Sequence, residues 1–196
     1  MDKLVADFAE KYNPEQTARF QKAVDFTKSV HEAQRRESGE PYYTHPEAVA
    51  GIVMGLGMDA ESVTAALLHD AVEDGEDITV EMIDKEFGAD IARLVDGVTK
   101  LTISGKQTYI TKKQEQAENL RKLFLAIAAD VRVVIIKLAD RLHNMRTIAY
   151  CTPFKRARKA KETLEVYAPL AHRFGMGAIK GELEDLSFMY LMPDEY

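Results

Sequence analysis

Signals for the start of a helix recur along this chain, and they constrain its fold more than any other feature. Asn13-Pro14-Glu15-Gln16 combines an N-cap residue, a proline at the first helical position and a glutamine at the capping-box position. Apolar residues then follow at helical spacing, so we interpret this segment as the first helix. We expect further helices to begin at His45-Pro46, Asp59, Thr79 and Thr152-Pro153, and a last one over about 176–191.

Two segments lack such clear signals. Residues 131–136 are rich in β-branched side chains, which favour strands. We interpret them as a buried helix because Leu138, Leu142 and Met145 continue the helical period without a turn signal. Residues from about 100 to 111 show no period and contain Gly105, which indicates a mobile loop. The sequence therefore predicts an all-α, compact, multi-helix fold with short connections.

Composition bounds the class of protein. The chain has 196 residues, 46% of them hydrophobic, which is enough for one sizeable domain with a buried core. Its longest apolar runs are too short to span a bilayer, and the N-terminus lacks the order of a secretion signal, so we expect a soluble, cytoplasmic protein without membrane contact. A single cysteine, Cys151, excludes an internal disulfide and a thiolate metal cluster.

The net charge of −6 argues against nonspecific nucleic-acid binding, which depends on neutralising many phosphates with lysine and arginine. A small anionic substrate stays compatible with the sequence because the basic residues are clustered. The clusters are 35–36, 112–113, 121–122 and 155–161, and a solvated helix face is the alternative interpretation of each.

An imidazole and three carboxylates are concentrated in the segment 69–74, directly after an apolar run. We expect a single helix from Asp59 to about Glu73, which places Glu73 four residues after His69 and Asp74 four after Asp70 on one face. That face is a candidate metal site, although a solvated helix face can also carry acidic residues.

Two residues outside this segment supply further candidate metal ligands. His45 lies at a helix start, and Asp140 shares a helical stripe with Asn144 and Thr147. Together with His69 and Asp70 they would provide two imidazoles and two carboxylates. Such a set suits a six-coordinate ion and leaves positions open for water or substrate.

The ordered pattern His45, His69-Asp70, Asp140 resembles that of the HD phosphohydrolases, and more narrowly the alarmone hydrolase domain of the RelA/SpoT family. The resemblance extends over nearly the whole chain, and five stretches carry it: 34–42, 66–74, 96–101, 116–122 and 137–147. It implies the all-α HD-domain fold. It also implies a substrate, guanosine tetra- or pentaphosphate (ppGpp or pppGpp), and hydrolysis that removes the 3′-pyrophosphate to leave GDP or GTP and so ends the stringent response.

The resemblance also implies roles for individual residues. The metal would be manganese, Mn²⁺, and its ligands would be the four residues of the ordered pattern. Glu73 and Asp74 correspond to an acidic pair required for hydrolysis, and because both are present we expect an active hydrolase. We assign them jointly to orienting the attacking water or accepting its proton. The alternative is that they hold a second ion or a ligating histidine.

For the nucleoside, the resemblance places Arg36 against the guanine face, and Asn144 and Thr147 near the base and sugar. The family often has a lysine directly after this arginine, whereas this chain has Glu37. Three further basic residues could contact phosphates, although a solvated role is at least as compatible with the sequence for each of them: Lys112, Lys113 and Arg121. We interpret His31 and His172 as structural.

The last thirty residues resemble the stretch that joins the hydrolase to the synthetase in long, two-activity members of the family. We therefore expect an HD hydrolase domain over 1–165 and a helical segment over 166–196 that leads toward a synthetase domain outside this chain. Synthetase and regulatory domains, and through them the ribosome, are the expected partners. Two alternatives stay open: an HD hydrolase of another nucleotide, such as NADPH or a deoxynucleotide, and a regulatory module that senses the alarmone without turnover.

Overall fold

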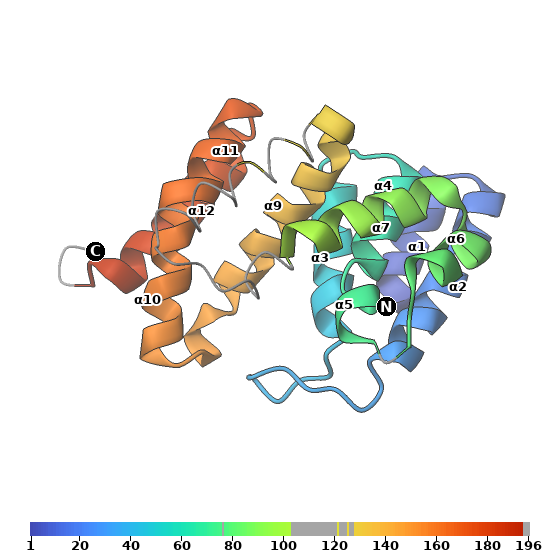
Figure 1. Ribbon diagram of the computed structural model, residues 1–196, viewed down its shortest axis with the longest axis horizontal. Coiled ribbons are helices and arrows are strands. Elements are labelled where there is room, and N and C mark those ends of the chain that lie inside the picture. The colour runs from blue at the N-terminus through green and yellow to red at the C-terminus, as the bar shows by residue number, and fades with distance from the viewer. Residues whose placement is uncertain (76, 103–120, 122–124, 126–127, 194–196) are drawn as a thin grey trace. The chain divides into compact units, whose positions relative to one another are not determined.

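The described part of the chain folds into helices, most of them joined by short connections, while the connection from His31 to Tyr43 is longer (Figure 1). The computed structural model describes residues 1–75, 77–102, 121, 125 and 128–193. Within these ranges there is no strand, and one isolated β-bridge joins Arg35 to Pro41. None of the helices described there is both long and apolar enough to cross a bilayer. The predicted all-α class is confirmed.

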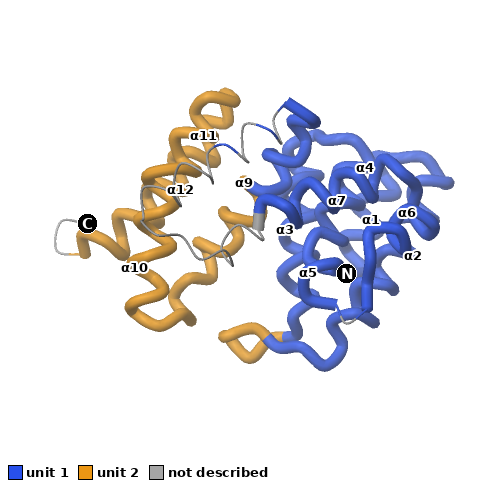
Figure 2. The backbone as a smooth tube through the Cα atoms, viewed as in Figure 1, with its two compact units in different colours: residues 1–35, 41–137 blue, residues 36–40, 138–196 orange. Residues whose placement is uncertain are grey.

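The chain divides into two compact units (Figure 2). Unit 1 comprises residues 1–35 and 41–137, and unit 2 comprises residues 36–40 and 138–196. The sequence passes from one to the other inside α9 (Val131–Arg146). The units are not the domains that we predicted, and a domain boundary near residue 165 stays a prediction.

Unit 1 is built around α4 (Ala60–Leu68), in which every residue except Glu61 is buried. A helix that is apolar on all sides belongs in the centre of a core. It packs against α2 (Pro14–Val30), α3 (Thr44–Gly55) and α7 (Ala89–Thr102). The other helices described in this unit are α1 (Asp2–Lys11), α5 (Ala71–Asp74), α6 (Val80–Phe87) and the start of α9.

Three of the predicted helix starts in this unit have side-chain caps, and the start expected at His45-Pro46 is found at Thr44 without one. Asn13 and Gln16 form a reciprocal capping box at the start of α2. The Asp59 carboxylate accepts a hydrogen bond of 2.7 Å from the Ser62 backbone N–H before α4, and Thr79 caps α6 in the same way. The sequence did not predict α1, which precedes the expected first helix. Its buried Phe8 stacks on Phe20 of α2, with ring centroids 4.0 Å apart.

The prediction of one helix from Asp59 to Glu73 is wrong. Helix α4 ends at Leu68, His69 and Asp70 form a turn, and α5 begins at Ala71. The His69 ring lies at this break, where its Nδ1 hydrogen-bonds the Ala66 carbonyl at 2.8 Å. Asp70 is the residue before α5, and its side chain makes no capping hydrogen bond to that helix.

Unit 2 begins within α9 and continues through η2 (Ile148–Tyr150), α10 (Pro153–Glu162), the π-helical turn η3 (Thr163–Tyr167), α11 (Ala168–Arg173) and α12 (Gly177–Leu191). The helical interpretation of 131–136 is confirmed, as are the helix starts at Thr152-Pro153 and near Met176. The widened turn η3 precedes Pro169, whose ring would clash with the carbonyl four residues earlier in a regular α-helix.

Some predictions fall on residues outside the described ranges. They are Lys112, Lys113 and the part of the expected loop from 103 to 111. Residues 100–102, which we had assigned to the same loop, belong to α7 instead. Arg121 is described and is exposed.

Gly97 of α7 lies against α9, and this close approach gives a test of the packing of unit 1. A Cβ at this position would lie 2.7 Å from Cγ2 of Val133, a buried residue with few accessible rotamers. Gly97→Ala is therefore expected to lower the free energy of unfolding by about 1–3 kcal/mol. Thermal unfolding followed by circular dichroism measures the effect as a lower Tm.

The matched control is Gly51→Ala in α3, where a Cβ would meet Cδ1 of Leu4 at an ordinary 3.8 Å. Because alanine favours helix by about 1 kcal/mol over glycine, this change should leave Tm unchanged or raise it. A Gly97→Ala protein as stable as the control would contradict the packing described here.

Candidate metal centre

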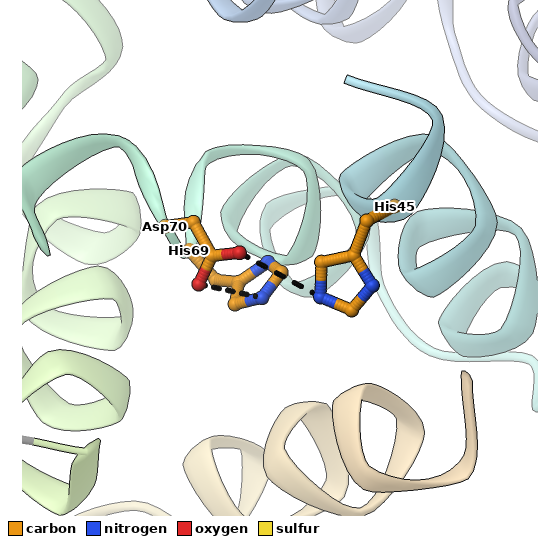
Figure 3. A group of neighbouring side chains, drawn as sticks. All are labelled: His45, His69 and Asp70. Carbon is orange, nitrogen blue, oxygen red and sulfur yellow. Dashed lines mark ion pairs between the residues drawn. The ribbon is translucent and has the colours of Figure 1, made fainter. Parts of the chain in front are cut away.

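His45, His69 and Asp70 come together in unit 1 from three helix boundaries (Figure 3). His45 is the second residue of α3, His69 directly follows α4, and Asp70 directly precedes α5. One ligand atom from each lies within 4.8 Å of the others. The two histidines are 3% and 2% exposed, whereas the Asp70 side chain is 16% exposed. The cluster therefore combines two buried nitrogen donors with a carboxylate that solvent can reach.

The tautomer of His69 follows from its surroundings. A backbone carbonyl can only accept a hydrogen bond, so the nitrogen that contacts the Ala66 carbonyl, Nδ1, must carry the hydrogen. In the neutral ring the lone pair is then on Nε2, which lies 3.0 Å from Oδ1 of Asp70. A lone pair and a carboxylate oxygen repel each other at this distance unless a positive charge lies nearby, either a ring proton or a metal ion.

The carboxylate of Asp70 faces both imidazoles, as the dashed lines in Figure 3 show. Its second oxygen, Oδ2, lies 3.6 Å from Nε2 of His45. The two rings have centroids 5.2 Å apart and are inclined at 64°. Nitrogen and carboxylate donors without thiolate suit manganese, iron, zinc or magnesium, so these residues fit a divalent metal ion.

Tyr42 joins this cluster to the acidic pair of α5. Its hydroxyl lies 3.0 Å from Oδ2 of Asp70 and 2.8 Å from Oδ2 of Asp74. Burial, and then the negative charges of the two aspartates, raise the pKa of Tyr42 well above its ordinary value, so the phenol is neutral and can donate. The sequence analysis gave Tyr42 no role. Its place three residues before His45 was the available signal.

The acidic pair lies in the short helix α5. The backbone N–H groups of Glu73 and Asp74 both donate to the Asp70 carbonyl, at 3.2 and 2.9 Å. Asp74 is exposed and Glu73 is half-buried. We expected the side chains of Asp70 and Asp74 to lie on the same face. They do so despite the break at residue 69, as the contacts of Tyr42 with both carboxylates show.

The other predicted site residues belong to unit 2, where they form two hydrogen-bonded pairs. The Asn144 amide donates to Oδ1 of Asp140 at 2.5 Å, one helical turn away, and Asp140 is 6% exposed. The Arg36 guanidinium donates to the Thr147 hydroxyl at 3.0 Å. Thr147 in turn lies 3.0 Å from the His143 carbonyl, which can accept its proton. The metal cluster consists of unit 1 residues, whereas Asp140 belongs to unit 2, and its share in the metal site stays a prediction.

The comparison with protein families gives one match. The sequence model described as "HD domain" matches residues 23–177. This range includes every residue that we predicted for the site.

Several curated proteins are similar to this chain. It is 55% identical over 169 residues to the guanosine-3′,5′-bis(diphosphate) 3′-pyrophosphohydrolase of Haemophilus influenzae, which covers 86% of this chain and 24% of that protein. It is 50% identical over 186 residues to the bifunctional (p)ppGpp synthase/hydrolase SpoT of Escherichia coli, with coverage of 94% and 26%. A probable GTP pyrophosphokinase of Mycobacterium leprae is 49% identical over 196 residues, with coverage of 100% and 24%. The chain thus spans about a quarter of the length of these relatives.

A solved structure is also similar, with a TM-score of 0.62 and 28% sequence identity. The match covers 86% of this chain and 93% of the other. That protein is described as a metazoan ortholog of SpoT that hydrolyzes ppGpp.

If His45, His69 and Asp70 bind a divalent metal, Asp70→Asn should weaken Mn²⁺ binding strongly, because an amide removes the negative charge and keeps the size. Loss of residues that only support metal ligands typically costs about 10- to 100-fold in affinity, so loss of a ligand should cost at least about 100-fold. Titration calorimetry, with electron paramagnetic resonance to measure free Mn²⁺, gives the dissociation constant.

Asp25→Asn on the exposed surface of α2 is the matched control and should leave Mn²⁺ affinity unchanged. Equal affinity of the two variants would show that Asp70 is not a ligand.

Proposed function

This chain belongs to the HD domain family, and we propose that it hydrolyses ppGpp and pppGpp, removing the 3′-pyrophosphate to leave GDP or GTP. The resemblance to the RelA/SpoT family that the sequence indicated is confirmed by the relatives. The observation that carries the proposal is the cluster of two buried imidazoles and one carboxylate in unit 1. The names of similar proteins support the substrate.

For the cofactor we propose Mn²⁺, held by His45, His69 and Asp70, with Asp140 as a predicted fourth ligand. When bound, a divalent ion would lower the pKa of a coordinated water and neutralise charge on the pyrophosphate. The tautomer of His69 supports its share in this set, because its Nδ1–H is used by the Ala66 carbonyl and its Nε2 is left to act as a ligand.

Glu73 and Asp74 are the proposed catalytic carboxylates. They orient the attacking water and accept the proton that it releases. The water oxygen bonds to the phosphorus that is attached to the 3′ oxygen, and the bond between these two atoms breaks. The 3′ oxygen leaves with a proton, and pyrophosphate is released. The exposure of Asp74 and its hydrogen bond to Tyr42 support a carboxylate that is both reachable by water and fixed in orientation. We assign the proton to the pair, since close carboxylates can share one.

Arg36, Asn144 and Thr147 are the proposed nucleoside contacts. A planar guanidinium stacks well on a purine, and the hydrogen bond from Arg36 to Thr147 restrains that plane. Asn144 donates to Asp140, which ties a proposed nucleoside contact to a proposed ligand through one turn of α9. This proposed nucleoside contact and the proposed fourth ligand would then be coupled within unit 2.

Two alternatives to this function stay testable. One is hydrolysis of another nucleotide, such as NADPH or a deoxynucleotide, which a substrate panel would reveal. The other is an alarmone-sensing module that binds without turnover; the presence of both Glu73 and Asp74 favours turnover instead. The synthetase and regulatory partners, the domain boundary near residue 165 and the cytoplasmic location stay predictions.

Purified protein supplied with Mn²⁺ is expected to release pyrophosphate and GDP from ppGpp, measured by ion-exchange chromatography of the products. Asp70→Ala should abolish the reaction. Glu73→Gln and Asp74→Asn should each lower kcat by about 10²- to 10⁴-fold, the usual effect of losing general acid–base catalysis. Glu81→Gln on the exposed side of α6 is the control. Tight binding without product under every divalent metal would instead support the sensing module.

Replacement of Arg36 by lysine tests the nucleoside contact, because lysine keeps the charge and loses the planar group. We expect KM for ppGpp to rise about 10-fold with kcat nearly unchanged, the pattern of lost ground-state binding. Arg35→Lys is the matched control, since the Arg35 guanidinium donates to the carbonyls of Glu32 and Gln34. An equal KM in the two variants would argue against a role for Arg36.

A further inference from the structure

We propose that Tyr42 is a positioning residue for this site: its hydroxyl couples the metal ligand Asp70 to the catalytic carboxylate of Asp74, and His31 and Gln34 hold its ring and backbone in place. The proposal rests on the proposed function for its kinetic consequences. Its consequence for metal binding does not depend on that function.

The coupling is carried by a single hydroxyl. A phenol has one proton to donate, and here two carboxylate oxygens accept from it, Oδ2 of Asp70 at 3.0 Å and Oδ2 of Asp74 at 2.8 Å. Two carboxylates that would otherwise repel each other are thereby held at one point. Because Oδ2 of Asp70 also faces His45, the same contact sets the direction in which Asp70 presents its oxygens to the two imidazoles.

The Tyr42 ring lies against two histidines. The His31 ring, 1% exposed, has its centroid 4.8 Å from that of Tyr42 and is inclined at 30°. The His45 ring contacts it edge-on, with centroids 6.3 Å apart. The Tyr42 ring thus contacts two buried histidines, which restrain the position of its hydroxyl.

Gln34 connects the same segment to the acidic helix. Its Nε2 donates to the Asp74 carbonyl at 2.7 Å, so its Oε1 is the acceptor that faces Nδ1 of His31 at 2.7 Å. The Tyr42 backbone N–H donates to the Gln34 carbonyl at 3.1 Å. The side chain and the backbone of Gln34 thus connect His31, Tyr42 and Asp74 in one hydrogen-bonded network.

This arrangement assigns the hydrogen of neutral His31 to Nδ1. Its Nε2 is buried and has no hydrogen-bond partner among the described residues. A buried acceptor left without a partner costs about 1–3 kcal/mol. The His31 ring is nonetheless held by Gln34 and lies against the Tyr42 ring, a placement that supports this segment.

Tyr42→Phe tests the proposal, because it keeps the ring against His31 and removes the hydroxyl. We expect Mn²⁺ affinity to fall about 10- to 100-fold, as for other groups that orient metal ligands. At saturating Mn²⁺, kcat for ppGpp should fall about 10-fold while KM changes less than about 3-fold, since Asp74 loses its restraint and the nucleoside contacts are untouched. Calorimetry gives the dissociation constant, and circular dichroism verifies the fold.

Tyr43→Phe is the matched control: the same substitution at the next residue, which is half-buried at the N-cap of α3. It should match the wild type in both measurements. A Tyr42→Phe protein whose Mn²⁺ affinity lies within twofold of the control overturns the proposal. If the wild type binds Mn²⁺ but does not hydrolyse ppGpp, the proposed function fails, and the affinity comparison still decides the role of Tyr42.

Discussion

The hydrogen bond from His69 to the carbonyl of Ala66 is the interaction on which the candidate metal centre depends. It fixes the imidazole to α4, the most deeply buried helix of unit 1, and so gives the ring a rigid support. It places the hydrogen on Nδ1 and the lone pair of the neutral ring on Nε2, the nitrogen that faces Asp70. The chain turns directly after this contact, and α5 begins after Asp70. One side-chain contact thus orients one candidate ligand, and the adjacent turn places Asp70 beside it.

Much of the helical fold could be predicted because helix caps act locally. The donors that Asn13, Asp59 and Thr152 satisfy lie three residues further along the chain, within any sequence window. Helix α1 has no side-chain cap, and its burial depends on contacts with α2. No local sequence signal therefore predicted it. The break after Leu68 was missed for a related reason. The apolar period continues through it, so no signal in the sequence marks the turn at His69 and Asp70.

The residues of the candidate site also divide into those that the sequence could predict and those that it could not. His45, His69 and Asp70 could be selected by residue type and by resemblance, and the structure brings all three together. Tyr42 could not, because its hydroxyl contacts residues 28 and 32 positions away, and a tyrosine in a loop has many ordinary explanations. The passage of α9 from unit 1 to unit 2 was equally hidden, since the helical pattern is continuous across residues 137 and 138.

Glu37 shows how a departure from the family pattern can be absorbed by the fold. It occupies the position where the resemblance led us to expect a lysine beside Arg36, and a carboxylate there would oppose a phosphate-bearing ligand. In unit 2 the Lys155 ammonium of α10 lies 2.6 Å from the Glu37 carboxylate. This hydrogen bond is the main cause that holds the pKa of Glu37 below its ordinary value, so the two charges are present together and offset each other. Binding at this loop would then depend on the plane of Arg36 and its bond to Thr147, not on a second cation at position 37.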